Sequence, residues 1–401
     1  MKKTVLGAAV LMLAACGGET KDPTNPTTVT SASATPVDSA PVASTSATVA
    51  PPPKPPLAEL MKKTSAAMMG AWAAHDVKKL MPTYSDDAVL SMPGPMGWMD
   101  AKKADIETSM GGLFAAFPDS QMTATRTFVK GNVAVTESVF TGTNTGDFMG
   151  QKATGKKVGY HAVMVNWFND DGLVSKEHVY YDHVTAMSQM GKGDPKAKFR
   201  AVEAAPTATA SVIVAKDSPD EAKTVDAVKT WYTAFEKKDD KAFLAPFADD
   251  VVHMDFTQPA DFKGKDGAKK EWAELFKTFP DAKIAPTNVW AFDTFVVAEI
   301  GMTATMKGAM GPIKATNKSG TVHMLDVFEM KDGKVKAVAS YGSLAEAAFA
   351  FGVTPPPGPK DAPPKDGPKD GTPKTTPTAT PKPVTTGAPT PVPAPTAAPK
   401  K

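Results

Sequence analysis

Two stretches of the chain each begin with apolar residues that would share one face of a helix. Recurrence every three or four residues is the pattern of an amphipathic helix whose apolar stripe packs on a core. We therefore predict a long first helix at the start of each stretch. The apolar positions are Leu57, Leu60, Met61, Met68, Met69 and Trp72 in the first stretch, and Val225, Val228, Trp231, Tyr232 and Phe235 in the second.

Shorter elements follow in the same order in both stretches. In the first, a short second helix carries Leu80 and Tyr84, and a third helix over about 101–117 ends before Pro118. Strand-like runs come next, with Asp170-Asp171-Gly172 as one of the hairpin turns. Helices followed by an antiparallel meander predict an α+β fold. The strand-like runs are about 121–130, 132–141, 157–168 and 173–182.

The two stretches are also similar to each other in sequence. Phe117-Pro118-Asp119 matches Phe279-Pro280-Asp281, and further matches keep the same order at offsets of 161 to 163 residues. Repeated matches at a nearly fixed offset indicate a duplicated domain. We place the two domains at 57–192 and 219–353, which are ordinary domain lengths.

The remaining segments have compositions that cannot bury a core. Residues 17–56 and 354–401 are rich in Pro and Thr, so we expect a disordered tether and a disordered tail. Residues 193–218, rich in Ala and Thr, are expected to form a linker between the domains.

Residues 1–16 have the features of an export signal. Two lysines precede an apolar run that ends in Leu13-Ala14-Ala15-Cys16, too short for a transmembrane helix. The run resembles a lipobox, and Cys16 is the one cysteine in the 401 residues. We predict a lipoprotein held to the membrane by acyl chains on Cys16. Gly17 favours the outer membrane, and an ordinary cleaved signal is the alternative.

Charge and motifs exclude several classes of function. The 45 basic and 43 acidic residues nearly balance, which argues against nucleic acid as a partner. The sequence contains no phosphate loop, nucleophile elbow or zinc-ligand spacing. We therefore expect no cofactor and no metal.

Several motifs of the first domain resemble the SnoaL-like branch of the NTF2-like superfamily. They are Trp72-Ala73-Ala74-His75-Asp76, Tyr84-Ser85-Asp86-Asp87-Ala88, the glycine-flanked run 142–150, and Lys176-Glu177-His178. The second domain resembles the same superfamily more weakly. The resemblance implies two tandem cone-shaped domains, each with three helices on a curved antiparallel sheet around an apolar pocket. Members include polyketide cyclases, ketosteroid isomerases and non-enzymatic binding modules, so the fold does not fix the function.

Strand alternation suggests which side chains line the pocket of the first domain. If the last strand of the second domain turns Val335, Ala339 and Tyr341 inward, the repeat turns the matching residues of the first domain inward. The expected catalytic candidates are His161, His178, Tyr180 and Asp182, and the expected pocket residues are Trp72, Val163, Val165 and Trp167.

These residues would support proton transfer next to a carbonyl group. A carboxylate in an apolar cone has a raised pKa and can act as a base, while a His or Tyr stabilises the enolate oxygen. The resemblance implies that Asp182 is this acid/base. The alternative is that it caps the strand end or pairs with His183 or Lys192. In the second domain the polar candidates are His253, Asp255, His323 and Asp326.

Two functions are compatible with the sequence. The first is a lipid-anchored envelope protein whose first domain binds, and in an enzyme would isomerise or cyclise, a small apolar carbonyl compound. The second is a non-catalytic interaction or scaffold lipoprotein. Duplication also suggests that the two domains pair within the chain or that the chain forms a homodimer.

Overall fold

The computed structural model describes residues 54–353, except 95, 194 and 311–312. The predicted signal, Cys16, most of the tether and the tail from residue 354 lie outside the described residues. All described residues fall within one compact unit. No helix among them is long and apolar enough to span a membrane.

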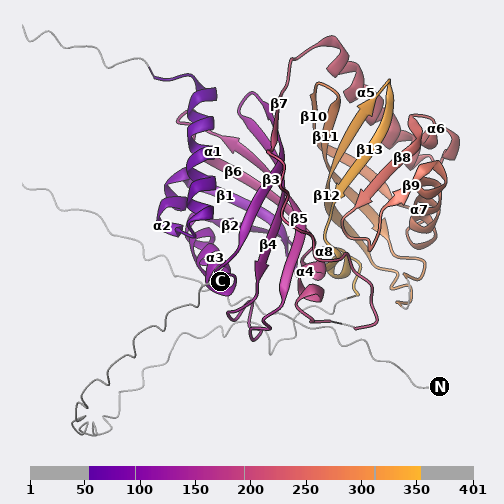
Figure 1. Cartoon of the computed structure of the whole chain (residues 1–401). Helices are drawn as coiled ribbons and strands as arrows, with labels where there is room; N and C mark the ends of the chain where they lie inside the picture. The colour runs from indigo at the N-terminus through magenta and orange to yellow at the C-terminus, as the bar shows by residue number, and fades with distance from the viewer. Residues whose placement is uncertain (1–53, 95, 194, 311–312, 354–401) are drawn as a thin grey trace, which may run out of the picture. The chain divides into compact units, whose positions relative to one another are not determined.

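The first domain is a curved sheet with helices against one face (Figure 1). The strands lie in the order β2-β1-β6-β5-β4-β3-β7, and β1 pairs parallel with β6 in an otherwise largely antiparallel sheet. The helices are α1 (Leu57–Ala73), α2 (Val77–Leu80), η1 (Met81–Thr83), α3 (Lys103–Ala116) and α4 (His183–Gln189). The strands are β1 (Tyr84–Gly94), β2 (Gly97–Lys102), β3 (Gln121–Lys130), β4 (Val133–Thr143), β5 (Lys157–Phe168), β6 (Val174–Tyr181) and β7 (Ser211–Val214).

The second domain repeats this plan. Its strands lie in the order β10-β11-β12-β13-β8-β9. Ser218 caps α5, and Glu221 completes a capping box. The helices are α5 (Pro219–Glu236), α6 (Asp240–Leu244), α7 (Gly264–Thr278) and α8 (Leu344–Ala350). The strands are β8 (Phe247–Asp255), β9 (Phe262–Lys263), β10 (Lys283–Phe292), β11 (Phe295–Thr305), β12 (Ser319–Lys331) and β13 (Lys334–Tyr341).

The predicted α+β class and tandem arrangement are confirmed, with two corrections. Tyr84 belongs to a strand, β1, and not to the second helix, because β1 and β2 lie between the second and third helices. The pattern of β1 does not alternate simply, since the strand is buried between β2 and β6 within the sheet. The expected linker contains β7, which pairs parallel with β3.

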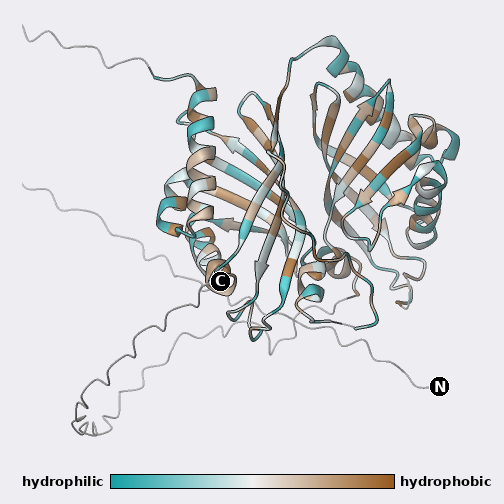
Figure 2. Ribbon diagram, viewed as in Figure 1, coloured by the Kyte–Doolittle hydropathy of each residue, from teal (hydrophilic) through white to brown (hydrophobic). Residues whose placement is uncertain are grey.

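Three layers of apolar residues hold this part of the chain together. Helix-side cores fill each domain. A further cluster joins the helix-free faces of the two sheets and includes Val163, Val165 and Tyr180 of the first domain and Leu325 and Tyr341 of the second. Figure 2 shows brown, apolar residues along the strands of both sheets, whereas teal, polar residues gather on α5 and α7. The domains therefore pair through their sheets.

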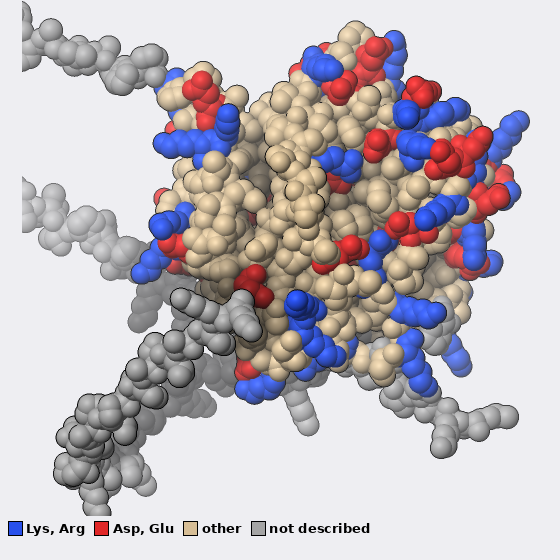
Figure 3. All heavy atoms as spheres, viewed as in Figure 1, with Lys and Arg blue, Asp and Glu red and all other residues tan. Residues whose placement is uncertain are grey.

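The charged side chains are mixed in sign. On the face drawn in Figure 3, Lys and Arg alternate with Asp and Glu, and neither sign forms a broad patch. This distribution agrees with the near-neutral balance of the sequence.

Candidate functional site

Most of the residues expected to line the first cone lie instead between the two sheets. Val163, Val165 and Trp167 contact the apolar cluster that the two domains share. The reason is a one-residue error in the repeat register. Val163 pairs with Tyr180, and the equivalent pair is Leu325 with Tyr341, so β5 and β12 correspond at an offset of 162 and not 161. A slip of one residue turns every side chain of a strand to the opposite face.

His178 and Tyr180 bind a carboxylate of the other domain. The Tyr180 hydroxyl donates to Glu299 Oε1 at 2.8 Å, and His178 Nδ1 lies 2.7 Å from the same oxygen. The reciprocal contact is made by Tyr341, which donates to Glu137 Oε1 at 2.7 Å. Both glutamates are almost fully buried. His178 and Tyr180 therefore lie in the interface between the domains and not in the cone of the first domain.

Asp182 caps two helices, one from each domain. Its carboxylate accepts hydrogen bonds from the backbone of Val184 and Thr185 in α4, and from Leu344 N–H at the start of α8. Burial raises the pKa of Asp182 to about 6, and these donors oppose the rise. The capping alternative describes this position, because the oxygens face helix ends and not the cone.

His161 and Trp72 occupy different surroundings. His161 stacks on Phe256 of the second domain with ring centroids 4.0 Å apart, and burial with the nearby Arg200 charge lowers its pKa to about 4. Trp72 lies on the helix side of the first domain, where it packs edge-on against Phe114. Of the eight site residues expected in the first domain, Trp72 is the one that packs into the helix-side core of that domain.

The helix side of the first domain is largely aromatic and holds a different polar pair. Tyr160 stacks on Phe140 at 4.9 Å and on Tyr181 at 5.5 Å. Deeper in the domain, Tyr84 donates to Glu177 at 2.6 Å, and burial raises the pKa of Glu177 to about 7. The Tyr84–Glu177 pair was not anticipated from the sequence.

The helix side of the second domain contains a continuous chain of hydrogen bonds. Tyr232 of α5 donates to Asp326 Oδ2 at 3.0 Å, and Ser340 of β13 donates to Asp326 Oδ1 at 2.6 Å. His253 Nε2 lies 2.8 Å from Ser340 Oγ, and His253 Nδ1 lies 2.5 Å from Glu271 Oε2 on α7. We call these five residues the polar chain.

The hydrogen-bond directions place the protons at the Ser340 end of the polar chain, and the pKa of His253 sets its charge. Ser340 has one hydroxyl proton, which goes to Asp326, so His253 Nε2 must donate to Ser340. Burial alone would lower the pKa of His253, but the charge and hydrogen bond of Glu271 raise it to about 9. His253 is therefore an imidazolium at neutral pH and donates through both nitrogens. Burial raises the pKa of Asp326, while the Ser340 and Tyr232 hydroxyls stabilise its ionised form.

Sequence reasoning anticipated part of this chain. His253 and Asp326 were among the candidates, and the structure joins them through Ser340. Asp255 stands apart, because its carboxylate accepts from the backbone and hydroxyl of Thr257 in a turn. The expectation that Ala339 and Tyr341 turn inward with Val335 was wrong, because the register shifts between Val335 and Ala337, a bulge that interrupts alternation. The same bulge turns Ser340 toward the helices. The alternation of strand residues could not identify Tyr232 and Glu271, because both lie on helices.

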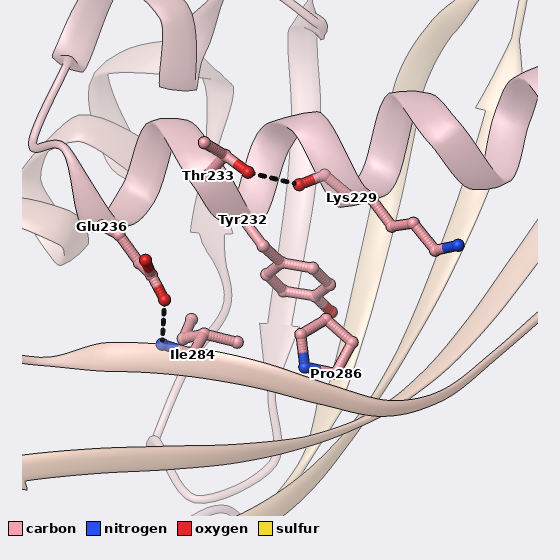
Figure 4. A pocket seen from close by; sticks show the side chains of 6 residues that line it. All are labelled: Lys229, Tyr232, Thr233, Glu236, Ile284 and Pro286. Carbon is pink, nitrogen blue, oxygen red and sulfur yellow. Dashed lines mark hydrogen bonds between the residues drawn. The ribbon is translucent and has the colours of Figure 1, made fainter.

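A cavity of about 310 Å³ lies beside the Tyr232 end of the polar chain. Tyr232 lines it, and Figure 4 shows the Tyr232 ring pointing from α5 toward Pro286 of β10. This volume is near the lower end of ligand pockets. The other lining residues are Lys229, Thr233, Glu236 and Ile284. Among the described residues, no group of three or more His, Cys, Asp or Glu side chains is placed to hold a metal ion.

Comparison with known proteins matches both domains to family models. Residues 63–190 match the SnoaL-like polyketide cyclase model, and residues 228–338 match a SnoaL-like domain model. No curated protein matches the chain.

Solved structures resemble single domains of this chain. The putative polyketide cyclase IdmH from Streptomyces antibioticus is 24% identical, with 33% of this chain and 99% of that chain covered and a TM-score of 0.30. A putative SnoaL-like polyketide cyclase from Jannaschia is 18% identical, with coverage of 35% and 99% and a TM-score of 0.33. AclR, a putative hydroxylase from Streptomyces galilaeus, is 19% identical, with coverage of 34% and 99% and a TM-score of 0.31. On the evidence of the two family models, the chain carries two SnoaL-like domains in tandem.

Proposed function

We propose that this protein binds a small, mostly apolar molecule in the cavity of the second domain. SnoaL-like domains are ligand-binding or cyclase and isomerase modules, and two of them are present here. The observation that carries the proposal is the polar chain, which ends at Tyr232 in the wall of the cavity. Besides polar groups, the lining includes the apolar side chains of Ile284 and Pro286, and a concave site that combines apolar and polar groups is a usual form of small-molecule site.

The same arrangement suits proton transfer. Asp326 is buried, its pKa is raised by burial, and it faces two hydroxyl groups. A carboxylate of this kind can take up a proton at neutral pH more readily than an exposed one. We place any acid/base chemistry at Asp326 and Tyr232 in the second domain. Of the acid/base candidates expected in the first domain, His178 and Tyr180 lie in the domain interface and Asp182 caps two helices.

Native mass spectrometry of the full chain carrying Cys16→Ser tests ligand binding. We expect a small molecule to co-purify and to be lost in Thr233→Trp, whose indole would close the mouth of the cavity. Thr230→Trp is the matched control, because Thr230 lies on the same exposed helix face and makes the same type of bond to the backbone four residues earlier. Equal ligand content in the two variants would place the ligand elsewhere.

We further propose that Cys16 carries the lipid that holds the protein to the cell envelope, with the outer membrane as its destination. The support is the lipobox-like run that ends in Cys16 and the Gly at position 17. Metabolic labelling with a radioactive fatty acid tests this directly. We expect label and membrane fractionation in the wild type and neither in Cys16→Ser. Labelling of the Ser variant would assign the lipid to another site.

A non-catalytic scaffold is the second candidate. The pairing of the two sheets favours it, since apolar residues of both sheets are used for contact between the domains. Light scattering coupled to size-exclusion chromatography measures whether the chain is a monomer or a dimer in solution. We expect a monomer for the Cys16→Ser chain, because each sheet face is already covered by the other domain.

A further inference from the structure

The two buried glutamates of the domain interface have different partners within their own sheets. In the first domain, Arg126 lies directly across from Glu137, and its Nε donates to Glu137 Oε2 at 2.6 Å. At the same register position in the second domain, Asn288 lies across from Glu299 and donates a neutral amide N–H to Glu299 Oε2 at 2.6 Å. An arginine in a protein does not lose its proton, whereas an asparagine has no charge. The second domain therefore lacks a fixed cation at this position.

His178 of the first domain takes the place of that cation. Its Nδ1 lies 2.7 Å from Glu299 Oε1, so the two groups form an ion pair when the imidazole is protonated. The second domain has Ala339 at the position of His178, because Val165 pairs with His178 and Val327 pairs with Ala339. The ion pair of Glu299 thus crosses the interface, whereas the corresponding ion pair of the first domain is internal to that domain.

His178 is partly accessible to solvent while its partner is buried. The side chain of His178 is 14% exposed and that of Glu299 is 1% exposed. Trp98 of β2 and Trp167 of β5 flank the imidazole edge-on, with ring centroids at 5.5 Å and 4.8 Å. Tyr180 donates to the same oxygen of Glu299 that His178 contacts. A proton can therefore be exchanged at His178 while the carboxylate remains in an apolar surrounding.

Other charged groups lie around His178 on β6, β2, β12 and α8, and each is engaged by a neighbour other than Glu299. They are Lys176 over the ring of Trp167, Asp100 hydrogen-bonded to Ser91, and His323 paired with Glu346. The charge across the interface at Glu299 therefore depends on the proton of His178.

We propose that the interface between the two domains is a pH-sensitive joint that opens more readily when His178 loses its proton. Histidine is the side chain that ordinarily titrates between about pH 5 and 8. Below this range His178 gives Glu299 a charge-assisted hydrogen bond. Once His178 is neutral, the donors that the structure shows around Glu299 are all uncharged. A neutral hydrogen bond is weaker than a charged one by roughly fivefold in an equilibrium constant, so the interface opens more often as pH rises.

A single reporter thiol can measure this opening. Cys16 is the one cysteine of the chain, so the full chain carrying Cys16→Ser accepts one new cysteine. Val327→Cys lies in the interface cluster, and Val296→Cys, in the helix-side core of the same domain, is its matched control. Labelling by a pyridyl disulfide is measured at about pH 5.5 and about pH 8. Each rate is divided by the rate for the urea-unfolded chain at the same pH, which removes the titration of the thiol.

We expect the corrected labelling rate at Val327→Cys to be roughly fivefold higher at the upper pH, and the rate at Val296→Cys to change less. Two further substitutions, made with Val327→Cys, remove the pH dependence in different ways. His178→Gln keeps a donor for Glu299 but has no proton to lose, so its rates at both pH values should match that of the parent at the upper pH. Asn288→Arg gives Glu299 a fixed cation, so its rates should stay low at both.

One other group that joins the domains titrates in the same range. Asp182 binds Leu344 N–H of the second domain, and burial raises its pKa to about 6. The increase assigned to His178 is therefore the difference between parent and variant. His161→Gln is the control for loss of an interface histidine, because His161 stacks on Phe256, and we expect it to keep the full increase.

The proposal is overturned if the parent shows no increase at Val327→Cys, or an equal increase at both reporters, which would mean unfolding of the whole chain. It is also overturned if the full increase persists in His178→Gln, because the pH dependence would then belong to Asp182. Loss of the increase in His161→Gln would assign it to the wrong histidine. If either variant does not fold, the other variant and the two reporters in the parent still decide the question.

Discussion

The two domains share a fold and an interface but differ in the chemistry of their interiors. In the second domain, the facing pair on the central strands is Asp326 and Ser340. In the first domain, the pair at the same place is Met164 and Val179. His253, the next member of the polar chain, pairs with Val338, and its counterpart Leu90 pairs with Glu177. One copy thus places a polar chain where the other places apolar side chains.

The interface between the domains differs from the interiors in this respect, because both domains contribute the same kind of hydrogen bond to it. Each central sheet carries one buried glutamate, Glu137 or Glu299, which accepts a tyrosine hydroxyl from the other domain. The features that hold the copies together are alike, and the features that give each interior its chemistry are different. We conclude that pairing is common to both domains and that the binding site is specific to the second.

Exchange of the central residues is expected to give the largest effect. Met164→Asp would place a carboxylate in the first domain without the Ser, Tyr and His partners that Asp326 has, and an unpaired buried charge should cost about 4 kcal/mol or more. Asp326→Met leaves Ser340 and Tyr232 without an acceptor and should cost about 2–3 kcal/mol. Urea unfolding followed by tryptophan fluorescence measures both. A smaller cost for Met164→Asp would mean that the two interiors are more alike than the structure indicates.

Removal of the partners of the two buried glutamates is expected to give the next largest effect. Arg126 makes a charged contact with Glu137 at 2.6 Å, whereas Asn288 makes a neutral one with Glu299 at the same distance. We expect Arg126→Ala to destabilise the chain by about 3 kcal/mol, because a buried carboxylate loses its cation. Asn288→Ala should cost about 1 kcal/mol. Equal effects in denaturant unfolding would show that the ion pair contributes no more than a neutral hydrogen bond.

Two buried histidines, one in each domain, should make stability depend on pH in opposite directions. Burial lowers the pKa of His183 in the first domain to about 4, below the unfolded value near 6.5, so its contribution is present above pH 6.5 and is lost as pH falls toward 4. The pKa of His253 in the second domain is raised to about 9, so its contribution is present below pH 6.5 and is lost as pH rises through 9.

Stability measured between pH 4.5 and 9.5 tests this contrast. The shift of His183 corresponds to a loss of up to about 3 kcal/mol toward acid. His183→Gln should weaken the loss of stability toward acid, and His253→Gln the loss toward base. The expected contrast is wrong if His183→Gln changes the loss of stability toward base, or if His253→Gln changes the loss toward acid.

Changes at Asp182 are expected to have the smallest effect. Because burial raises its pKa to about 6, the stabilisation from its protonated form is present below the unfolded pKa and is lost as pH rises through 6. Asp182→Asn keeps one acceptor oxygen but turns an amide NH2, a donor, toward N–H groups that the other oxygen served, and should cost about 0.5–1 kcal/mol at pH 7. Asp182→Ala should cost about 1–2 kcal/mol. A similar cost for both variants in thermal unfolding would argue that the charge, and not the cap, matters.

Local sequence patterns predicted the elements that depend on local contacts. The helical spacing around Trp72 and Phe235 reflects side chains that face one core from one helix. The strand-like runs of β4 and β5 are rich in apolar residues because both faces of these strands are buried. The parallel strands β1 and β8 were harder, because they pair with the last strand of each domain and their pattern depends on residues distant in the sequence. Strand β7 was likewise hard to predict, because it forms by pairing with the edge of β3, which is distant in the sequence.

The candidate site was only partly predictable because strand faces depend on register. His253 and Asp326 could be proposed as polar residues on strands, but Ser340 lies after a bulge that no residue type announces. The same bulge explains why Tyr180 was assigned to the first cone, because its counterpart Tyr341 follows the bulge and faces the interface. Val163 was assigned there for another reason, a one-residue error in the repeat offset. A duplicated sequence aligned at offsets of 161 to 163 does not say which offset holds in each strand.

The sequence by itself determined the duplication, the α+β class, and the presence of a lone Cys16 in a lipobox-like run, since each is a property of neighbouring residues or of a repeat. Only the tertiary structure decided which face of each sheet meets the other domain and which meets its own helices. That choice depends on bulges and cross-strand pairing, and it placed the polar chain in the second domain and the tyrosine–glutamate contacts in the interface.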